Sequence, residues 1–203
     1  MVILERLLKW AKEGSANPVR AATVSAQSGF DADCRRKKVV FAAHCMLNQN
    51  ARDAGSAEFA AMMKPLLEAL VTQDIGIIQL PCPELMVLGL GRGRDSCPTQ
   101  TIRERLESAE SQVGLESLVD QVVYQIQEYR KHGFQIIGIL GKNGSPACGV
   151  GPALAISGAE GVFIRLLRQR IHAAGLDICI EGIDDDDQRQ SIEWISKQID
   201  RVR

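Results

Sequence analysis

The stretch VVFA at residues 39–42 is an uninterrupted apolar run, which is typical of a short strand buried on both faces of a parallel sheet. Similar runs follow along the chain, at residues 75–80, 135–140 and 176–180. Segments with apolar residues at helical spacing accompany these runs, at residues 57–71, 116–131, 159–174 and 186–201. Strands that alternate with helices predict right-handed crossovers and a mostly parallel sheet. We therefore expect an α/β fold, Rossmann-like or flavodoxin-like, with about four strands flanked by helices.

The segment before this alternation has a different character. Residues 3–12 place apolar side chains on one helical face, whereas residues 13–35 are rich in Ser, Ala and Gly and show no sustained period. We expect residues 1–37 to form an N-terminal helix with a flexible lead-in, and residues 38–203 to form a single α/β domain. The acidic run DDDD at residues 184–187 is expected to cap the last helix, where negative charge meets the positive end of the helix dipole.

Composition excludes several classes of protein. Apolar residues make up 45% of the chain and charged residues 24%, near the globular average and unlike disordered or coiled-coil sequences. The 24 basic and 25 acidic side chains nearly cancel, so a nucleic-acid partner is not expected. No apolar stretch approaches the roughly 18 residues of a membrane span, and the N-terminus lacks the apolar core of a signal peptide. We expect a cytoplasmic protein without a membrane partner, in which cysteines stay reduced.

Three of the six cysteines follow predicted strands. Cys45 lies three residues beyond the first strand, Cys82 two beyond the second and Cys148 eight beyond the third. In open α/β sheets ligands bind at the carboxyl ends of the strands, and neighbouring strands lie close together. These three thiols should therefore converge if their strands are adjacent.

Converging thiolates favour soft metals, namely zinc, copper(I) or an iron–sulfur cluster. Structural zinc sites usually contain C-x-x-C pairs, which this sequence lacks, whereas an iron–sulfur cluster accepts dispersed cysteines and can leave one iron without a protein ligand. The alternative is that each cysteine simply packs at the end of its strand. The remaining cysteines, Cys34, Cys97 and Cys179, have no position that predicts a ligand role, and Cys179 is expected to be buried inside the fourth strand.

The residues around two of the cysteines favour a ligand-binding site over simple packing at the strand ends. Cys82 stands in PCPE at residues 81–84, where two prolines stiffen the chain and a carboxylate follows the thiol. Cys148 stands in a glycine-rich stretch, residues 138–151, whose backbone could approach a cluster or an anion closely. This stretch does not match the phosphate-binding Walker pattern.

Three motifs surround these cysteines: AHCMLNQN at residues 43–50, QLPCPE at residues 79–84 and NGSPACGV at residues 143–150. Together they resemble the TudS family of thiouracil desulfurases, most closely its branch of TudS-related desulfidases, over about residues 38–183. The resemblance implies a 4Fe-4S cluster held by Cys45, Cys82 and Cys148, with a fourth iron free to take the sulfur of a thiolated nucleobase.

The first motif departs from the S-A-C-L-L-G that is usual in this family. His44 and Asn48 place an imidazole and an amide beside the cluster position, and Ala147 stands where a serine is common. Arg52 and Asp53 stand about where the family often has a basic residue followed by an acidic one. These departures affect which substrate is expected and leave the expected cluster unchanged, because all three cluster ligands are retained.

The activity that the resemblance implies is a non-redox desulfurase. It would remove sulfur as sulfide from a small thiolated substrate such as thiouracil, with the substrate sulfur bound to the open iron and water attacking the carbon. Glu84 would act as base toward that water and then as acid toward the leaving group, and Ser145 would orient the substrate or hydrogen-bond to the cluster. His44 would contact the substrate or the sulfur left behind, and Asn48 and Asn50 would read a nucleobase edge.

Structural roles stay open for each of these residues. Glu84 could cap a helix, Ser145 could serve in a turn, His44 could be a buried imidazole satisfied by backbone, and Asn48 and Asn50 could form Asx turns. Two other functions also stay open: a sulfur-transfer protein that delivers sulfide from the cluster, and a non-catalytic metal-binding or redox-sensing domain. A cluster with one iron lacking a thiolate is expected to be lost in aerobic preparations. The sequence leaves the oligomeric state open, including a homodimer.

Overall fold

The computed structural model describes residues 33–93, 99–151, 160–187 and 189–201. The chain divides into two units, Met1–Arg35 and Arg36–Arg203, and the fold described below belongs to the second. The helix expected at residues 3–12 and the loop cysteine Cys97 lie outside the described residues.

The sheet confirms the predicted fold class. Its four strands are β1 (Lys38–Ala42), β2 (Gly76–Gln79), β3 (Gln135–Lys142) and β4 (Ile180–Ile183). They lie in the order β2-β1-β3-β4, and every pairing is parallel. The strand that opens the domain is therefore central, paired with β2 on one side and with β3 on the other. The strands that precede Cys45, Cys82 and Cys148 are therefore neighbours, which the expected convergence of these cysteines requires.

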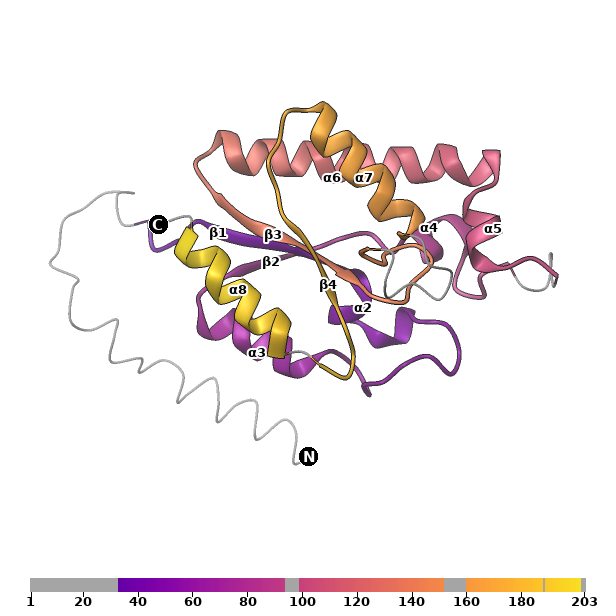
Figure 1. The fold of residues 1–203 in the computed structure, drawn as a ribbon, viewed down its shortest axis with the longest axis horizontal. Helices are drawn as coiled ribbons and strands as arrows, with labels where there is room; N and C mark the ends of the chain where they lie inside the picture. The colour runs from indigo at the N-terminus through magenta and orange to yellow at the C-terminus, as the bar shows by residue number, and fades with distance from the viewer. Residues whose placement is uncertain (1–32, 94–98, 152–159, 188, 202–203) are drawn as a thin grey trace, which may run out of the picture. The chain divides into compact units, whose positions relative to one another are not determined.

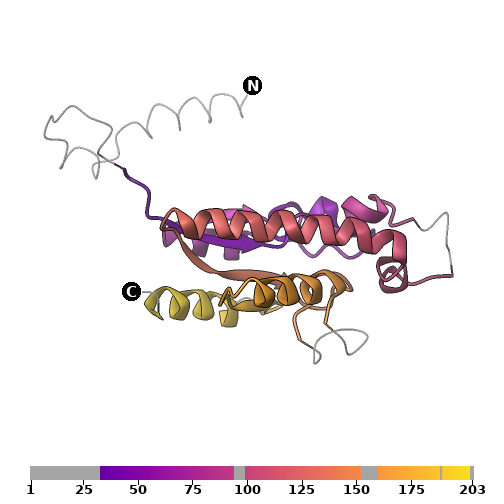
Figure 2. The same cartoon turned by 90° about the horizontal axis from the view of Figure 1, so that it is seen from above.

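Helices cover both faces of this sheet (Figure 1). The helices α6 (Ala109–Lys131) and α7 (Val162–Ala173) lie on one face, and α3 (Lys64–Thr72) and α8 (Arg189–Arg201) lie on the other. In the view from above, α7 and α8 lie toward the β4 edge of the sheet and α6 lies along its other half (Figure 2). None of the helices in the described ranges is long and apolar enough to cross a membrane.

Short helices follow the strands at their carboxyl ends. They are α2 (His44–Leu47) with the 3₁₀ turn η1 (Gln49–Ala51) after β1, and α4 (Pro83–Leu88) with α5 (Ile102–Leu106) after β2. No helical period is visible in the sequence of these segments, because each is too short to show one. They gather at one end of the sheet (Figure 1).

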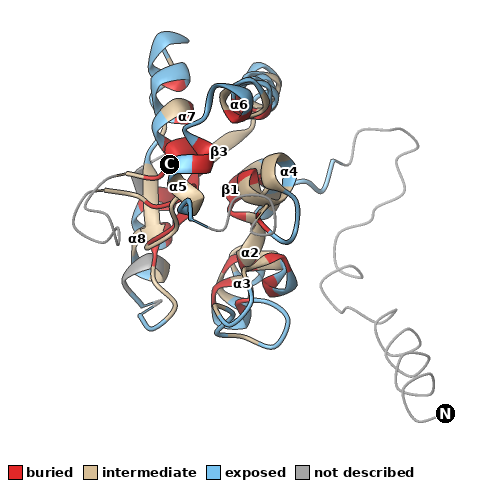
Figure 3. Cartoon of the chain, turned by 90° about the vertical axis from the view of Figure 1, so that its right-hand side faces the viewer, coloured by how far each residue is buried: buried red, intermediate tan, exposed pale blue. Residues whose placement is uncertain are grey.

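The core forms on both faces because β1 alternates between them. Val39 and Phe41 pack with α6 and α7, whereas Val40 and Ala42 pack with α3 and α8. Buried residues lie between the layers, and exposed residues lie on the outer faces of the helices (Figure 3). The pairing of β3 with β1 shifts register by one residue before Gly138. Gly138 leaves room for the ring of Trp194 in α8, which would lie 2.4 Å from a Cβ at that position.

Several predicted elements have different bounds in the structure. The helix expected at residues 116–131 begins seven residues earlier, at Ala109. The helix expected at residues 57–71 begins at Lys64, because Pro65 fits only in the first turn of a helix. The backbone before it pairs elsewhere, with the amide of Met63 donating to the carbonyl of Met46 at 2.8 Å. The fourth strand begins at Ile180 rather than ending there.

The expectation that Cys179 is a buried strand residue is wrong, since Cys179 precedes β4 and is exposed. The acidic run also does more than cap α8. Asp187 accepts a hydrogen bond from the amide of Arg189 at 3.1 Å, but Asp184 and Asp185 bind side chains near the carboxyl end of β3. The sequence therefore predicted only one of the contacts of this run.

Candidate functional site

A cavity of about 410 Å³ lies at the carboxyl ends of β1, β2 and β3. Cys45, Cys82 and Cys148 all line it, as do His44, Glu84 and Ser145. The structure thus brings together the three cysteines that strand positions selected, although they lie 37 and 66 residues apart along the chain.

Each cysteine is fixed by the strand that precedes it. Pairing continues past the ends of the strands, because the amide of Ala43 donates to the carbonyl of Leu140 at 2.9 Å and that of Leu80 donates to Ala42 at 2.8 Å. Cys45 then falls in α2, and Cys82 is the N-cap residue of α4. The adjacent carbonyl of Ala147 accepts hydrogen bonds from the first turn of α7, which fixes the loop that carries Cys148.

The loop with Cys148 also depends on a glycine. A Cβ on Gly141 would lie 2.6 Å from the carbonyl oxygen of Cys148, which is closer than side-chain carbons approach backbone oxygens. Gly141 therefore allows β3 and the loop after it to pack together.

Cys148 is buried, Cys45 and Cys82 are partly buried, and the pKa values of all three thiols are raised. Burial raises the pKa of Cys45 to about 11, an effect that Arg52 and Lys142 oppose. Burial also raises the pKa of Cys82, and it raises that of Cys148 well above its usual range with further contributions from the neighbouring Cys45 and Cys82. The thiols are therefore protonated at neutral pH, and a metal that binds them must displace protons.

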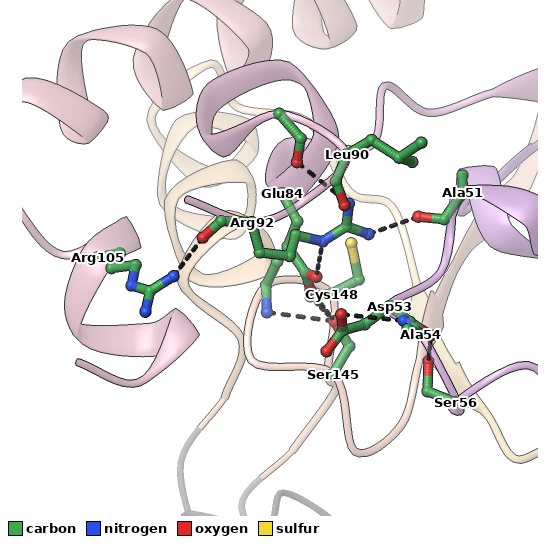
Figure 4. A network of polar contacts seen from close by, with 12 residues as sticks. Ala51, Asp53, Ala54, Ser56, Glu84, Leu90, Arg92, Arg105, Ser145 and Cys148 are labelled. Carbon is green, nitrogen blue, oxygen red and sulfur yellow. Dashed lines mark hydrogen bonds and ion pairs between the residues drawn. The ribbon is translucent and has the colours of Figure 1, made fainter. Parts of the chain in front are cut away.

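One buried arginine, Arg92, connects the segments that carry Cys45 and Cys82 (Figure 4). Arg92 donates from Nε to Glu84 Oε2 at 2.9 Å, from Nη1 to the carbonyl of Leu90 at 3.0 Å, and from Nη2 to the carbonyl of Ala51. Its φ of 57° lies in the left-handed region, which costs free energy for a residue with a Cβ. The contacts of the guanidinium hold this conformation in place.

Glu84 extends this network to the Cys148 loop. Ser145 Oγ donates to Glu84 Oε1 at 3.2 Å and accepts from the amides of Cys148 at 3.0 Å and Ala147 at 3.2 Å. The side chains of Arg92 and Glu84 are only 2% and 12% exposed, so this ion pair is largely removed from water. Ala51 follows Cys45, Glu84 follows Cys82 and Ser145 precedes Cys148, so the network fixes the three segments relative to one another.

A second polar group lies on the other side of Cys45. Asp185 Oδ2 accepts from Arg52 Nη1 at 2.9 Å and from Lys142 Nζ at 3.1 Å. All three side chains are at most 17% exposed. Arg52 and Lys142 also line the cavity, so two cations and one carboxylate lie close to the Cys45 thiol.

His44 lines the cavity next to Cys45 in sequence. Its Nδ1 lies 2.6 Å from Gln79 Nε2, and burial lowers its pKa. Its Nε2 is buried and has no hydrogen-bond partner among the described residues. His44 is therefore a neutral imidazole at neutral pH, and Gln79 contacts its Nδ1.

Asn48 and Asn50 are not placed in the cavity. Both are exposed, and Asn48 Oδ1 accepts from the amide of Asn50 at 3.1 Å and from its Nδ2 at 3.0 Å. This is the Asx turn that was the alternative to a role in reading a nucleobase.

Sequence reasoning missed Arg92, Lys142, Asp185 and the Gln79 contact as parts of this site. Arg92 stands in a polar stretch with no periodicity, and Lys142 and Asp185 follow strands without any motif that marks them. A charged residue at or just beyond the carboxyl end of a parallel strand was the available signal, and it applies to Lys142, the last residue of β3, and to Asp185, two residues beyond β4, but not to Arg92.

The donor set of the cavity fits an iron–sulfur cluster with three protein ligands. In the described part of the chain, no group of three or more His, Cys, Asp or Glu side chains is placed to hold a single metal ion. A cluster differs from a single ion because each thiolate binds a different iron.

Comparison with known proteins gives one distant relative. The chain is 29% identical over 114 residues to the uncharacterized protein MJ0003 of Methanocaldococcus jannaschii, which corresponds to 56% of this chain and 69% of that protein. No family model matches the chain. No solved structure matches it either.

Proposed function

We propose that this protein is a desulfurase that uses a 4Fe-4S cluster to remove sulfur as sulfide from a small thiolated substrate such as thiouracil. The observation that carries the proposal is the convergence of Cys45, Cys82 and Cys148 on one cavity. The resemblance of the surrounding motifs to the TudS family supports it. A cytoplasmic location, where thiols stay reduced, suits such a site.

The three cysteines would hold the cluster as thiolates. When bound, the cluster supplies an iron without a protein ligand, which acts as a Lewis acid toward a thiocarbonyl sulfur. The chain contributes the positive charge of Arg52 and Lys142, both of which favour the thiolate form of Cys45. Arg92 and Glu84 form a largely buried pair whose charges cancel.

Glu84 is the residue that we assign to proton transfer. Its Oε1 accepts a hydrogen bond from Ser145 and its Oε2 accepts one from Arg92, and a carboxylate has about four lone-pair sites. Each oxygen therefore keeps a lone pair with no donor among the described residues. A water that attacks the substrate carbon can lose its proton to one of them, and the protonated acid can then protonate the leaving group.

Ser145 is a positioning residue in this proposal. Its hydroxyl donates to Glu84 and accepts from the amides of Ala147 and Cys148, which uses its one hydrogen and both lone pairs. It therefore orients the carboxylate and the Cys148 loop and has no lone pair left with which to attack a substrate.

The test begins with anaerobically purified and reconstituted protein, analysed for iron and acid-labile sulfide and then assayed for sulfide release from 2- and 4-thiouracil. We expect both cluster components and turnover. Serine variants of Cys45, Cys82 and Cys148 should lose the cluster, whereas the same change at the exposed Cys34 or Cys179 should not. Protein that holds neither iron nor sulfide after reconstitution would refute the proposal.

The role of Glu84 needs a separate comparison. Glu84→Gln should retain iron and sulfide but lose sulfide release, while Glu107→Gln, at an exposed carboxylate, should keep both. Cluster binding without turnover of any thiolated base would favour the sensing alternative, and transfer of sulfide to an acceptor would favour the sulfur-transfer alternative.

A further inference from the structure

The contact between Gln79 and His44 determines which nitrogen of the imidazole carries the proton. Ala42 and Gln79 are register partners in the β1–β2 pair, so the end of β2 lies beside the first turn after β1. Gln79 Nε2 lies 2.6 Å from His44 Nδ1. A side-chain amide nitrogen can only donate, so Nδ1 must accept and the proton of the neutral ring is on Nε2.

This arrangement leaves a buried donor without an acceptor. His44 Nε2 has no hydrogen-bond partner among the described residues, although the ring belongs to the cavity wall. Buried N–H groups are normally paired, and an unpaired one in a native structure indicates a missing partner. Asp53 and Glu84 both line the cavity, but neither carboxylate accepts a hydrogen bond from His44 Nε2.

We propose that His44 donates a hydrogen bond from Nε2 to a sulfur of the cluster, and that Gln79 is the positioning residue that fixes the required tautomer. The inference rests on the proposed function for its acceptor, since the sulfur belongs to the cluster. Hydrogen bonds to cluster sulfurs stabilise the more negative, reduced form and so raise the reduction potential. His44 and Gln79 thereby set the potential of the cluster.

Two substitutions of His44 separate a donor at Nε2 from simple packing. In His44→Gln the amide nitrogen reaches about as far as Nε2, whereas in His44→Asn it reaches only about as far as Nδ1. In reconstituted protein, redox titration followed by electron paramagnetic resonance should give His44→Gln a potential near that of the unchanged protein. His44→Asn should shift it to a more negative value.

Gln79→Leu provides an independent variant. It leaves the imidazole in place but removes the donor to Nδ1, so the potential should again shift to a more negative value. His132→Asn is the matched control, because His132 is 64% exposed at the end of α6 and should leave the potential unchanged. A potential that is the same in His44→Gln, His44→Asn and Gln79→Leu would overturn the donor role and leave the desulfurase proposal intact.

The tautomer can be measured without a cluster. The chain has three histidines, so nitrogen-15 spectra of the iron-free protein can assign the protonated nitrogen of His44. We expect the proton on Nε2, and in Gln79→Leu a mixture of both tautomers. A proton on Nδ1 in the unchanged protein would overturn the inference whatever the metal content, whereas failure of the unchanged protein to bind iron would overturn the proposed function and the acceptor together.

Discussion

Removal of the Arg92 guanidinium should destabilise the iron-free protein by about 3–5 kcal/mol. Arg92→Met keeps most of the apolar stem but removes the hydrogen bonds to Glu84, Leu90 and Ala51. The pair is 2% and 12% exposed, and removing one member of a buried ion pair costs about 3–5 kcal/mol because the other charge is left without compensation. A typical domain is stable by only about 5–15 kcal/mol, so the loss is large.

The measurement is urea unfolding of Arg92→Met followed by circular dichroism, with the slope compared to that of the unchanged protein. A second variant, Glu84→Leu with Arg92→Met, tests the cause. If the cost of the single variant comes from the unpaired carboxylate, replacing both charges with apolar side chains should recover part of the stability. The double variant should therefore be more stable than Arg92→Met alone.

Two results would refute this reasoning. A loss below about 1 kcal/mol in Arg92→Met would place the pair in the range of surface ion pairs, contrary to its burial. A double variant less stable than the single one would mean that the other contacts of Glu84, such as the hydrogen bond from Ser145, outweigh the cost of its unpaired charge. The same network predicts that Arg92→Met binds less iron after reconstitution, because it no longer fixes the three cysteine-bearing segments relative to one another.

Three further predictions concern the same cavity. Gly141→Ala should reduce both stability and iron content, since the new Cβ would lie 2.6 Å from the carbonyl oxygen of Cys148. Gly91→Ala should leave both unchanged, because a Cβ at that position meets no atom within 4 Å. Asp185→Asn should lower the pKa of Cys45, because the Asp185 carboxylate raises that pKa. Iodoacetamide should then alkylate Cys45 of the iron-free variant faster at pH 8, and an unchanged alkylation rate would contradict this prediction. The stability of the iron-free protein should fall by about 2–3 kcal/mol as the pH rises from 9 toward about 11. The reason is that the pKa of Cys45 is raised to about 11, so the folded state holds the thiol proton more tightly than the unfolded chain does. Urea unfolding at each pH should show a smaller loss of stability in Cys45→Ser.

The sheet and the convergence of the cysteines were predictable because they follow from local patterns. An apolar run such as residues 39–42 identifies a strand buried on both faces, and parallel pairing places the carboxyl ends of such strands at one edge. The position of a cysteine a few residues after each run is then enough to bring Cys45, Cys82 and Cys148 to one place. No knowledge of side-chain contacts is needed for this step.

The contacts that hold the site together were not predictable in the same way. Arg92 has a left-handed φ, and its guanidinium binds the carbonyl of Ala51, which is 41 residues away and which nothing in the neighbouring sequence indicates. The helix before β2 begins late for a related reason, since the amide of Met63 pairs with the carbonyl of Met46 in α2. Both features depend on tertiary partners that a local pattern does not contain.

The charges near Cys45 show how such tertiary contacts can adapt a cavity to its ligand. Arg52 and Lys142 share a single carboxylate oxygen of Asp185, so this group of three side chains keeps one net positive charge beside the thiol. The Arg92–Glu84 pair on the other side contributes no net charge. Three thiolates around a cluster core would bring negative charge into this buried space, and an unpaired buried charge is costly. A surplus of one cation next to Cys45 offsets part of that charge once the thiol protons leave, while Asp185 limits the repulsion between the two cations before a metal binds.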